Sequence, residues 1–333
     1  MTADAIRWAQ MRYRSMYGDM TQQELNPALT DQMSQQPVRM KTSREAFMDA
    51  WELYLDESYN DDHTLCIGGF LAPRDMWDAI GKAWRERLDY ENRRSTKRKL
   101  PAIRRYHATD VEGGNKEFSP RKGWPRDRRK LLSRRMCAII ADAGPCGIVV
   151  GGHIDEIKNH IDPASDIAKE TLYDICFRMA LNDAEQVMRL RFPGKQFRVI
   201  YDDSNYGKYI RRAAKRMETD PGAAPLLELF IGAVPGDSVV DLELQAADLL
   251  AYEGFKLLND RRRDDGTMRL GLRKLLGKKT PIQITRFTDQ NFHDMRQMID
   301  NIKAGVPTGQ GITSKLEVSV GGLEPLGLVI NNS

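Results

Sequence analysis

The sequence predicts an α/β fold in which an antiparallel meander and several parallel strands form one mixed sheet flanked by helices. Three short β-favourable runs occur before residue 155, and the strands that follow them alternate with helical patterns. Consecutive strands suit antiparallel pairing, whereas strands separated by helices suit parallel crossover connections. Of the 333 residues, 41% are hydrophobic and 29% are charged, a balance that allows a large buried core.

Two strands and a helix open the folded part of the chain. Residues 51–55 (WELYL) form a short aromatic run that ends in a polar turn starting with Asp56, and residues 64–71 (TLCIGGFL) form a second apolar run. Two such runs separated by a turn predict a β-hairpin. Residues 75–90 then carry apolar side chains at helical spacing, which predicts a helix.

The remaining elements alternate between helices and strands. Helices are predicted at residues 127–143, 165–191, 206–217 and 240–258, and strands at residues 147–154, 197–201 and 227–234. Strands separated by helices in this way favour parallel pairing. The complete order, a meander followed by helix-separated strands, is that of an RNase H-like fold.

We divide the chain into three parts. They are an N-terminal appendage at 1–45 with a short helix at 5–17, an RNase H-like domain at 46–262 with a basic insertion at about 91–126, and a C-terminal helix (290–304) and tail at 263–333. Several Pro and Gly residues break up the insertion, so we expect regular structure to be interrupted there.

Positive charge is concentrated in one segment. Residues 93–135 contain sixteen Lys and Arg against four Asp and Glu, whereas the rest of the chain contains 35 basic and 43 acidic residues. A basic block on an acidic body favours nucleic acid, DNA or RNA, as a partner. The alternative is a solvated insertion without a partner, because attraction to phosphate is unspecific.

Composition also bears on where the protein works. No stretch approaches the roughly 18 apolar residues of a membrane span, and the N-terminus lacks the apolar core of a secretory signal. The four cysteines, Cys66, Cys137, Cys146 and Cys176, form no CxxC pair. We therefore expect a cytoplasmic protein with reduced thiols and no membrane partner.

Acidic residues occur where a metal site can form. Asp56 and Glu57 follow the first strand, Asp202 follows a later strand, and Asp248 lies on the last long helix of the domain. If the two strands are neighbours that run the same way, their acids meet at one edge of the sheet. Clustered carboxylates repel one another unless a cation compensates, and carboxylates suit Mg²⁺ or Mn²⁺. The pattern predicts a metal site for phosphoryl transfer, with the three aspartates as ligands.

Several short motifs add to this pattern. They are the YLDES phrase at 54–58, the Gly68-Gly69 pair in the next strand, His107, the strand that ends in Asp202, Ser238, and the LQAADLLA phrase at 244–251. Over roughly residues 50–260, their order and spacing resemble the domain of unknown function 3800 family. The resemblance implies an RNase H-like fold and a metal-dependent nuclease that hydrolyses phosphodiester bonds.

The resemblance also implies roles for individual residues. It implies metal ligands at Asp56, Asp202 and Asp248, catalytic roles for these three and for Glu57 and His107, and supporting roles beside them for Ser58, Asp203, Ser238 and Gln245. Gln245 lies three residues before Asp248 and so shares its helix face. The family usually has glycine after the YLDES serine, where this chain has Tyr59.

Some of these residues keep a second interpretation. His107 is either a catalytic group or a hydrogen-bonded loop histidine, and Asp203 is either a second ligand or a cap for the next helix. Glu170 is a reserve ligand or, like Asp174, a surface acid. The basic helix face around Arg211 either follows a nucleic-acid backbone or is solvated.

The sequence thus leads us to expect a hydrolase, a Mg²⁺- or Mn²⁺-dependent nuclease acting on DNA or RNA. Two alternatives lack catalysis. One is a nucleic-acid-binding protein that keeps the fold, and the other is a partner-binding component of a mobile-element or defence system. Metal binding that is lost on Asp56→Asn distinguishes the enzyme from both.

Overall fold

The structure is a computed structural model. It describes residues 51–60, 64–160, 165–203, 207–218, 223–259, 270–275, 280–287, 292–293, 296–297 and 317–321. The predicted N-terminal appendage with its helix at 5–17 lies outside these residues, as does most of the predicted helix at 290–304.

Seven strands form one mixed sheet in the order β5-β4-β1-β2-β3-β6-β7. They are β1 (Trp51–Tyr59), β2 (Thr64–Ala72), β3 (Cys146–His153), β4 (Phe197–Asp202), β5 (Phe230–Gly236), β6 (Ile282–Arg286) and β7 (Glu317–Gly321). The first three strands pair antiparallel as a meander, and β4 and β5 extend the other side of β1 in parallel. The predicted α/β architecture, a mixed sheet with an antiparallel meander followed by parallel strands, is confirmed.

The last two strands are absent from the sequence prediction. β6 pairs parallel with β3, and β7 pairs antiparallel with β6. We expected a helix and a tail in the C-terminal segment. Its described part includes helical residues at 292–293 and 296–297, within the predicted helix, and in addition two strands that extend the same sheet.

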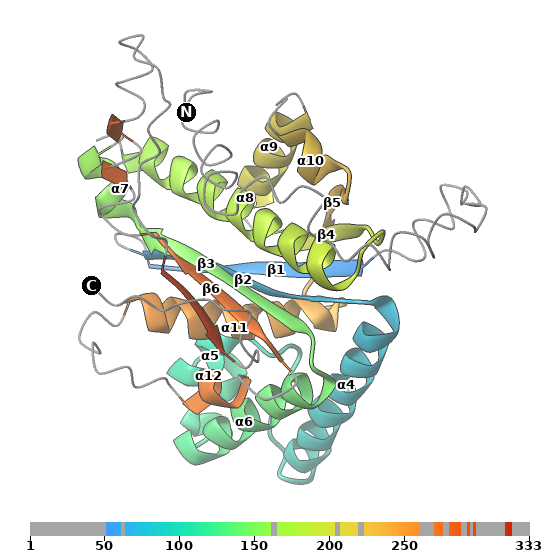
Figure 1. The fold of residues 1–333 in the computed structure, drawn as a ribbon. Coiled ribbons are helices and arrows are strands. Elements are labelled where there is room, and N and C mark those ends of the chain that lie inside the picture. The colour runs from blue at the N-terminus through green and yellow to red at the C-terminus, as the bar shows by residue number, and fades with distance from the viewer. Residues whose placement is uncertain are drawn as a thin grey trace, which may run out of the picture.

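Helices cover both faces of the sheet (Figure 1). On one face lie α7 (Ile154–His160), α8 (Ser165–Arg191), α9 (Gly207–Glu218) and α10 (Ala224–Leu227). On the other lie α4 (Arg74–Lys97), α5 (Ala108–Gly113), α6 (Arg126–Ala143), α11 (Leu242–Asn259) and α12 (Leu270–Leu275). Each face has its own hydrophobic core, one centred on α8 and one on α11.

Side chains along β1 alternate between these two cores, as the pleat of a strand requires. Leu53 and Leu55 enter the α8 core, whereas Tyr54 enters the α11 core. Because β1 stays paired with β2 as far as Tyr59, the strand end that we predicted before Asp56 is four residues too early. Asp56 lies within the strand, and the alternation directs it to the α11 face.

Helix α11 lies directly on the sheet. A Cβ atom added at Gly68 of β2 would stand 2.5 Å from the Ala251 Cα atom, so only glycine allows the helix to come this close. Most of α11 is buried, including the polar residues Gln245 and Asp248. Buried polar groups of this kind need hydrogen bonds or charges as partners.

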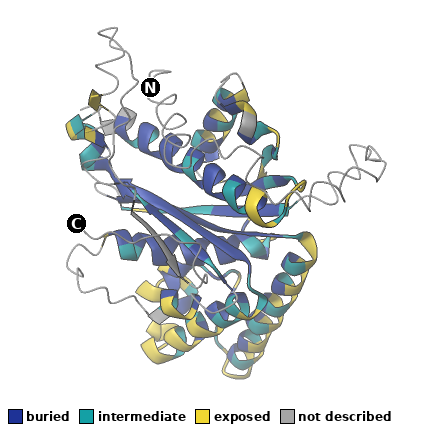
Figure 2. Ribbon diagram, viewed as in Figure 1, coloured by how far each residue is buried: buried dark blue, intermediate teal, exposed yellow. Residues whose placement is uncertain are grey.

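The basic insertion is folded against α11. It contains α5 and two 3-10 turns, η2 (Lys116–Phe118) and η3 (Pro120–Lys122). Ile103, Phe118 and Trp124 are buried in the α11 core, and the Arg128 guanidinium stacks over the Trp124 ring at 3.7 Å. Apolar side chains therefore hold the segment in place, while the outer surfaces of this helical layer are exposed (Figure 2).

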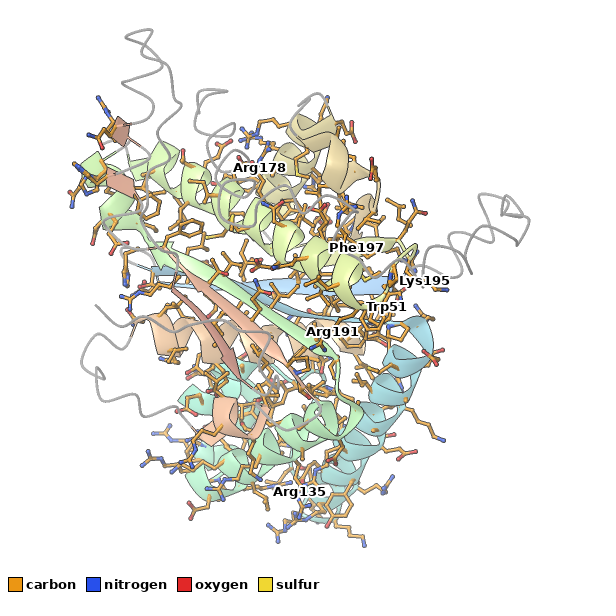
Figure 3. The ribbon with its side chains drawn as sticks, in the orientation of Figure 1. Trp51, Arg135, Arg178, Arg191, Lys195 and Phe197 are labelled. Atoms are coloured by element: carbon orange, nitrogen blue, oxygen red, sulfur yellow. The ribbon has the colours of Figure 1, made fainter. Side chains whose placement is uncertain are left out.

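Most cationic side chains of residues 93–135, which include the insertion and the first half of α6, face outward. Figure 3 labels one of them, Arg135, on the side of the helical layer that points away from the sheet. We call the exposed members the basic surface. They are Arg93, Lys97, Arg98, Lys99, Arg104, Lys116, Arg121, Lys122, Arg126, Lys130, Arg134 and Arg135.

Candidate active site

A cavity of about 220 Å³ lies where β1, β4, α11 and the start of α5 come together. Its walls combine four carboxylates with two cationic or titratable groups and several hydrogen-bonding side chains. The lining residues are Asp56, Glu57, Tyr59, Arg105, Tyr106, His107, Asp202, Ser238, Gln245 and Asp248. Segments far apart in the sequence thus meet in one polar cavity, which we call the acidic pocket.

Most of the site residues proposed from the sequence line the acidic pocket. All five proposed catalytic residues do so, together with Ser238 and Gln245. Ser58 is half-buried on β1 and does not line it. Asp203 is exposed, and its carboxylate pairs with Arg211 at 2.7 Å. Neither Ser58 nor Asp203 therefore supports the pocket directly.

Asp56 and Glu57 enter the pocket from β1. The Glu57 backbone N–H donates to Asp56 Oδ1 at 2.8 Å, and the Tyr173 hydroxyl donates to Glu57 Oε2 at 3.0 Å. Burial raises the pKa of Asp56 well above its usual value, and repulsion from Glu57, Asp248 and Asp202 raises it further. In the absence of a cation, the pocket thus opposes ionisation of Asp56.

Asp202 reaches the same place because β4 runs parallel to β1. Leu55 and Tyr201 are partners in register, and the next residue on each strand is an aspartate. The Ser238 backbone N–H, from the connection between β5 and α11, donates to Asp202 Oδ1 at 3.2 Å. Parallel pairing and a backbone hydrogen bond together fix this carboxylate.

Asp248 enters from the helix side and is only 5% exposed. Its Oδ2 accepts the Ala108 backbone N–H at 2.7 Å, and its Oδ1 faces His107 Nε2 at 3.9 Å. Burial raises the pKa of Asp248, while His107, the Ala108 hydrogen bond and Arg105 oppose that rise. On balance the pKa of Asp248 is raised, so burial outweighs these groups and disfavours the ionised form.

His107 connects two acids. Its Nδ1 lies 2.9 Å from Asp110 Oδ2, and Lys116 Nζ lies at the same distance from that oxygen. With Nδ1 engaged by Asp110, the Nε2 atom is the one directed toward Asp248. The side chain is 31% exposed, so the ring is accessible from the pocket that it lines.

Gln245 holds the walls of the pocket together. Its Oε1 accepts the Trp84 Nε1–H at 3.0 Å and the Tyr106 backbone N–H at 2.9 Å. Its Nε2 donates to the Ser238 backbone carbonyl at 2.7 Å. Because both ends of this fully buried amide are engaged, Gln245 acts as a structural cross-link.

Three lining residues were not proposed as site residues from the sequence. Arg105 is half-buried and donates through Nη1 to Ser238 Oγ at 2.8 Å. Tyr106 contributes its backbone and ring, and Tyr59 stands where the family usually has glycine. Arg105 is one of sixteen basic residues at positions 93–135. Only its position two residues before His107 could have marked it as a site residue.

The reserve candidates lie in an ion-pair network between α8 and α9. Glu170 pairs with Arg212 and Arg216 at 3.3 and 3.5 Å, and Asp174 pairs with Arg178 and Arg216, each at 3.2 Å. Neither acid lines the acidic pocket. The basic face of α9 is thus largely engaged by acids of the same protein.

The three aspartates share one feature that bears on metal binding. Each uses one carboxylate oxygen to accept a backbone N–H, from Glu57, Ser238 or Ala108. Anchored carboxylates of this kind are oxygen donors suited to a hard divalent cation. Within the part of the chain that the structure describes, however, no three His, Cys, Asp or Glu side chains are arranged so that they could hold a metal ion together.

Comparisons of the chain with protein-family models, with curated proteins and with solved structures give no match. Among the helices that the structure describes, none has the length and apolar character needed to cross a membrane. Support for the chemistry of the acidic pocket thus comes from the pocket residues themselves.

Proposed function

We propose that this chain is a metal-dependent nuclease of the domain of unknown function 3800 family, with an RNase H-like fold, that hydrolyses phosphodiester bonds in DNA or RNA. One observation carries the proposal. Asp56, Asp202 and Asp248, from two parallel strands and a buried helix, line one pocket with His107. The meander followed by parallel strands agrees with that fold.

The carboxylate oxygens of the acidic pocket are donors of the kind that Mg²⁺ or Mn²⁺ prefers. The repulsion that raises the pKa of Asp56 comes from three neighbouring carboxylates, and a cation placed among them relieves it. Asp56, Asp202 and Asp248 would hold the cation through oxygens that the backbone leaves available. When bound, such a cation activates a water molecule and stabilises the leaving oxygen of a phosphodiester.

Other pocket residues serve the same reaction. His107, held at Nδ1 by Asp110, presents Nε2 toward the pocket and can give a proton to the leaving oxygen. Glu57, held by the Tyr173 hydroxyl, can accept a proton from the attacking water. Ser238 and Gln245 keep Asp202 and the Arg105–His107 segment in position.

Nucleic acid is the substrate class that the charge distribution supports. The basic surface lies on the α4–α6 layer, and the exposed Arg104 directly precedes the pocket residue Arg105. Cations arranged beside an acidic pocket can hold a phosphate backbone while one phosphate enters the pocket. The four buried, free cysteines agree with the cytoplasmic location that we propose.

One observation favours a second candidate function. Because the described side chains include no three-ligand group able to hold a metal, a protein that binds nucleic acid without cutting it also agrees with the fold. A partner-binding component of a mobile-element or defence system is the related case in which the basic surface contacts protein. Neither candidate requires the acidic pocket to bind metal.

The test uses purified protein, Mg²⁺ or Mn²⁺, and a panel of single- and double-stranded DNA and RNA. We expect metal-dependent cleavage that Asp56→Asn and Asp248→Asn abolish, together with the heat of Mn²⁺ binding in calorimetry. Asp203→Asn is the matched control, since this exposed aspartate next to Asp202 does not line the pocket. Cleavage that survives Asp56→Asn and Asp248→Asn would exclude the proposed site.

A further inference from the structure

Arg105 is a cation that faces the acidic pocket without pairing with its acids. Four carboxylates line the same cavity, those of Asp56, Glu57, Asp202 and Asp248. The hydrogen bond from Arg105 goes instead to the neutral Ser238 Oγ, at 2.8 Å. Among the described residues, no carboxylate comes within ion-pair distance of its guanidinium, whose charge reaches Asp248 only as a weaker influence on its pKa.

The position of Arg105 is fixed from two sides by the same buried amide. Gln245 Oε1 accepts the backbone N–H of Tyr106, the residue after Arg105. Gln245 Nε2 donates to the backbone carbonyl of Ser238, whose hydroxyl accepts from Arg105. One side chain of α11 therefore holds both the backbone that carries the guanidinium and the residue that orients it.

The Arg105 guanidinium has further N–H donors besides the one that Ser238 accepts. Arginine carries five N–H donors in a planar fork, and Ser238 Oγ accepts one of them. A cation that served only to neutralise the acids would pair with them, because ion pairs with carboxylates are the usual partners of arginine. The remaining donors suit an incoming tetrahedral anion, which they can hold through two parallel hydrogen bonds.

We propose that Arg105 is a catalytic residue that binds a non-bridging oxygen of the scissile phosphate. The inference rests on the proposed nuclease function and adds how an anionic substrate enters a pocket lined by carboxylates. In the pentacoordinate transition state the phosphoryl oxygens gain negative charge, and a fixed guanidinium stabilises that charge. Arg105 forms no covalent bond with the phosphate and transfers no proton.

Two variants and a matched control test this role. Arg105→Gln removes the charge and the fork, and Arg105→Lys keeps the charge alone. Arg85→Gln removes the same charge from an exposed residue of α4 that belongs neither to the acidic pocket nor to the basic surface. Three quantities are measured: Mn²⁺ affinity by calorimetry, affinity of the Mn²⁺-loaded protein for inorganic phosphate, and kcat and KM on an oligonucleotide.

We expect Arg105→Gln to keep Mn²⁺ affinity, to lose phosphate binding and to lower kcat roughly 10²- to 10³-fold, the usual effect of removing one transition-state donor. Arg105→Lys should recover part of the phosphate affinity. If Arg105→Gln fails to fold in a thermal melt, Arg105→Lys carries the comparison, with a loss of kcat that Arg85→Gln does not show. Arg85→Gln should leave kcat and phosphate affinity unchanged.

Three outcomes overturn the role of Arg105. The first is a wild-type protein that cleaves, with Arg105→Gln and Arg85→Gln equal in kcat and in phosphate affinity. The second is loss of Mn²⁺ affinity in Arg105→Gln, which would make Arg105 a positioning residue. The third is a wild-type protein that binds neither Mn²⁺ nor phosphate. If the wild type binds Mn²⁺ and phosphate but cleaves nothing, and Arg105→Gln loses its phosphate affinity, only the nuclease function is overturned.

Discussion

The buried carboxylate of Asp248 accepts the backbone N–H of Ala108 at 2.7 Å, across 140 positions of sequence. This hydrogen bond ties α11 to the first residue of α5 and brings His107 beside the same carboxylate. A buried acid needs such partners to remain in the fold. The contact therefore builds one wall of the acidic pocket and fixes one of its proposed metal ligands at the same time.

Asp248→Ala should destabilise the protein more than Asp248→Asn. Asparagine keeps an oxygen that can accept from Ala108, whereas alanine leaves that N–H buried without an acceptor. We expect the free energy of unfolding of the alanine variant to be lower by about 1–3 kcal/mol, measured by urea denaturation. Equal stability of the two variants would mean that the hydrogen bond contributes nothing to the fold.

Asp56→Asn should stabilise the metal-free protein at neutral pH. Burial and neighbouring acids raise the pKa of Asp56, so its ionised form weakens the fold. The neutral amide removes that cost and still accepts the Glu57 N–H. We expect a higher melting temperature than that of the wild type, in thermal melts with chelator at pH 7.5.

The gain should shrink at acidic pH, where Asp56 itself becomes protonated. Added Mn²⁺ should raise the melting temperature of the wild type but not of Asp56→Asn. Asp203→Asn provides the control, since it breaks only an exposed pair with Arg211 and exposed pairs contribute about 0–1 kcal/mol. A lower melting temperature for Asp56→Asn than for Asp203→Asn in chelator would contradict the prediction.

Five of the strands were predictable because each is an apolar or aromatic run between turns. β6 was missed because it has only five residues, IQITR. They alternate apolar with polar as a strand does, but so short a run does not stand out from a loop. Its assignment depends on pairing with β3, a contact between distant segments that local patterns do not contain.

The acidic pocket was predictable to the extent that strand geometry decides it. Parallel pairing of β1 and β4 brings Asp56 and Asp202 to neighbouring positions, as the order of elements implied. Ser58 and Asp203, which we expected beside the ligands, do not line the pocket. Ser58 lies two residues, roughly 7 Å, beyond Asp56 along β1. Asp203 lies off the sheet, because β4 ends at Asp202.

The basic insertion was likewise predictable only in part. Composition predicted its charge, but not that Ile103, Phe118 and Trp124 would bury it against α11. Nor did it separate Arg105 from its exposed neighbour Arg104. That distinction depends on Gln245, which holds the Tyr106 backbone from another part of the chain.

Gln245→Leu should destabilise the protein strongly and disturb the acidic pocket. Leucine leaves the Trp84 indole N–H, the Tyr106 N–H and the Ser238 carbonyl buried without their partner. Since each orphaned group costs about 1–3 kcal/mol, we expect a loss of at least about 3 kcal/mol in unfolding free energy. Chemical denaturation measures it.

A surface glutamine provides the control for that experiment. Gln196 donates one exposed hydrogen bond, to the Glu228 carbonyl at 3.0 Å. Gln196→Leu should therefore change stability by no more than about 0.5 kcal/mol. If Gln245→Leu changed the unfolding free energy equally little, the hydrogen bonds of Gln245 would not contribute measurably to stability.

Asp183 should give the fold a pH dependence that is separate from the acidic pocket. This buried residue of α8 accepts from Gln283 Nε2 at 2.7 Å and from Thr285 Oγ1 at 3.1 Å, both on β6. Burial raises the pKa of Asp183 to about 7. A raised acid pKa means that the folded state holds its proton more tightly than the unfolded chain.

The contribution of protonated Asp183 is therefore complete below the unfolded pKa of about 4 and is lost as pH rises toward 7. Asp183→Asn removes the titrating group but keeps a hydrogen-bonding amide facing β6. The variant should match the wild type near pH 4 and become more stable by about 4 kcal/mol at pH 8. Urea denaturation at several pH values measures this difference. A constant difference between pH 4 and pH 8 would show that Asp183 titrates alike in the folded and unfolded chains.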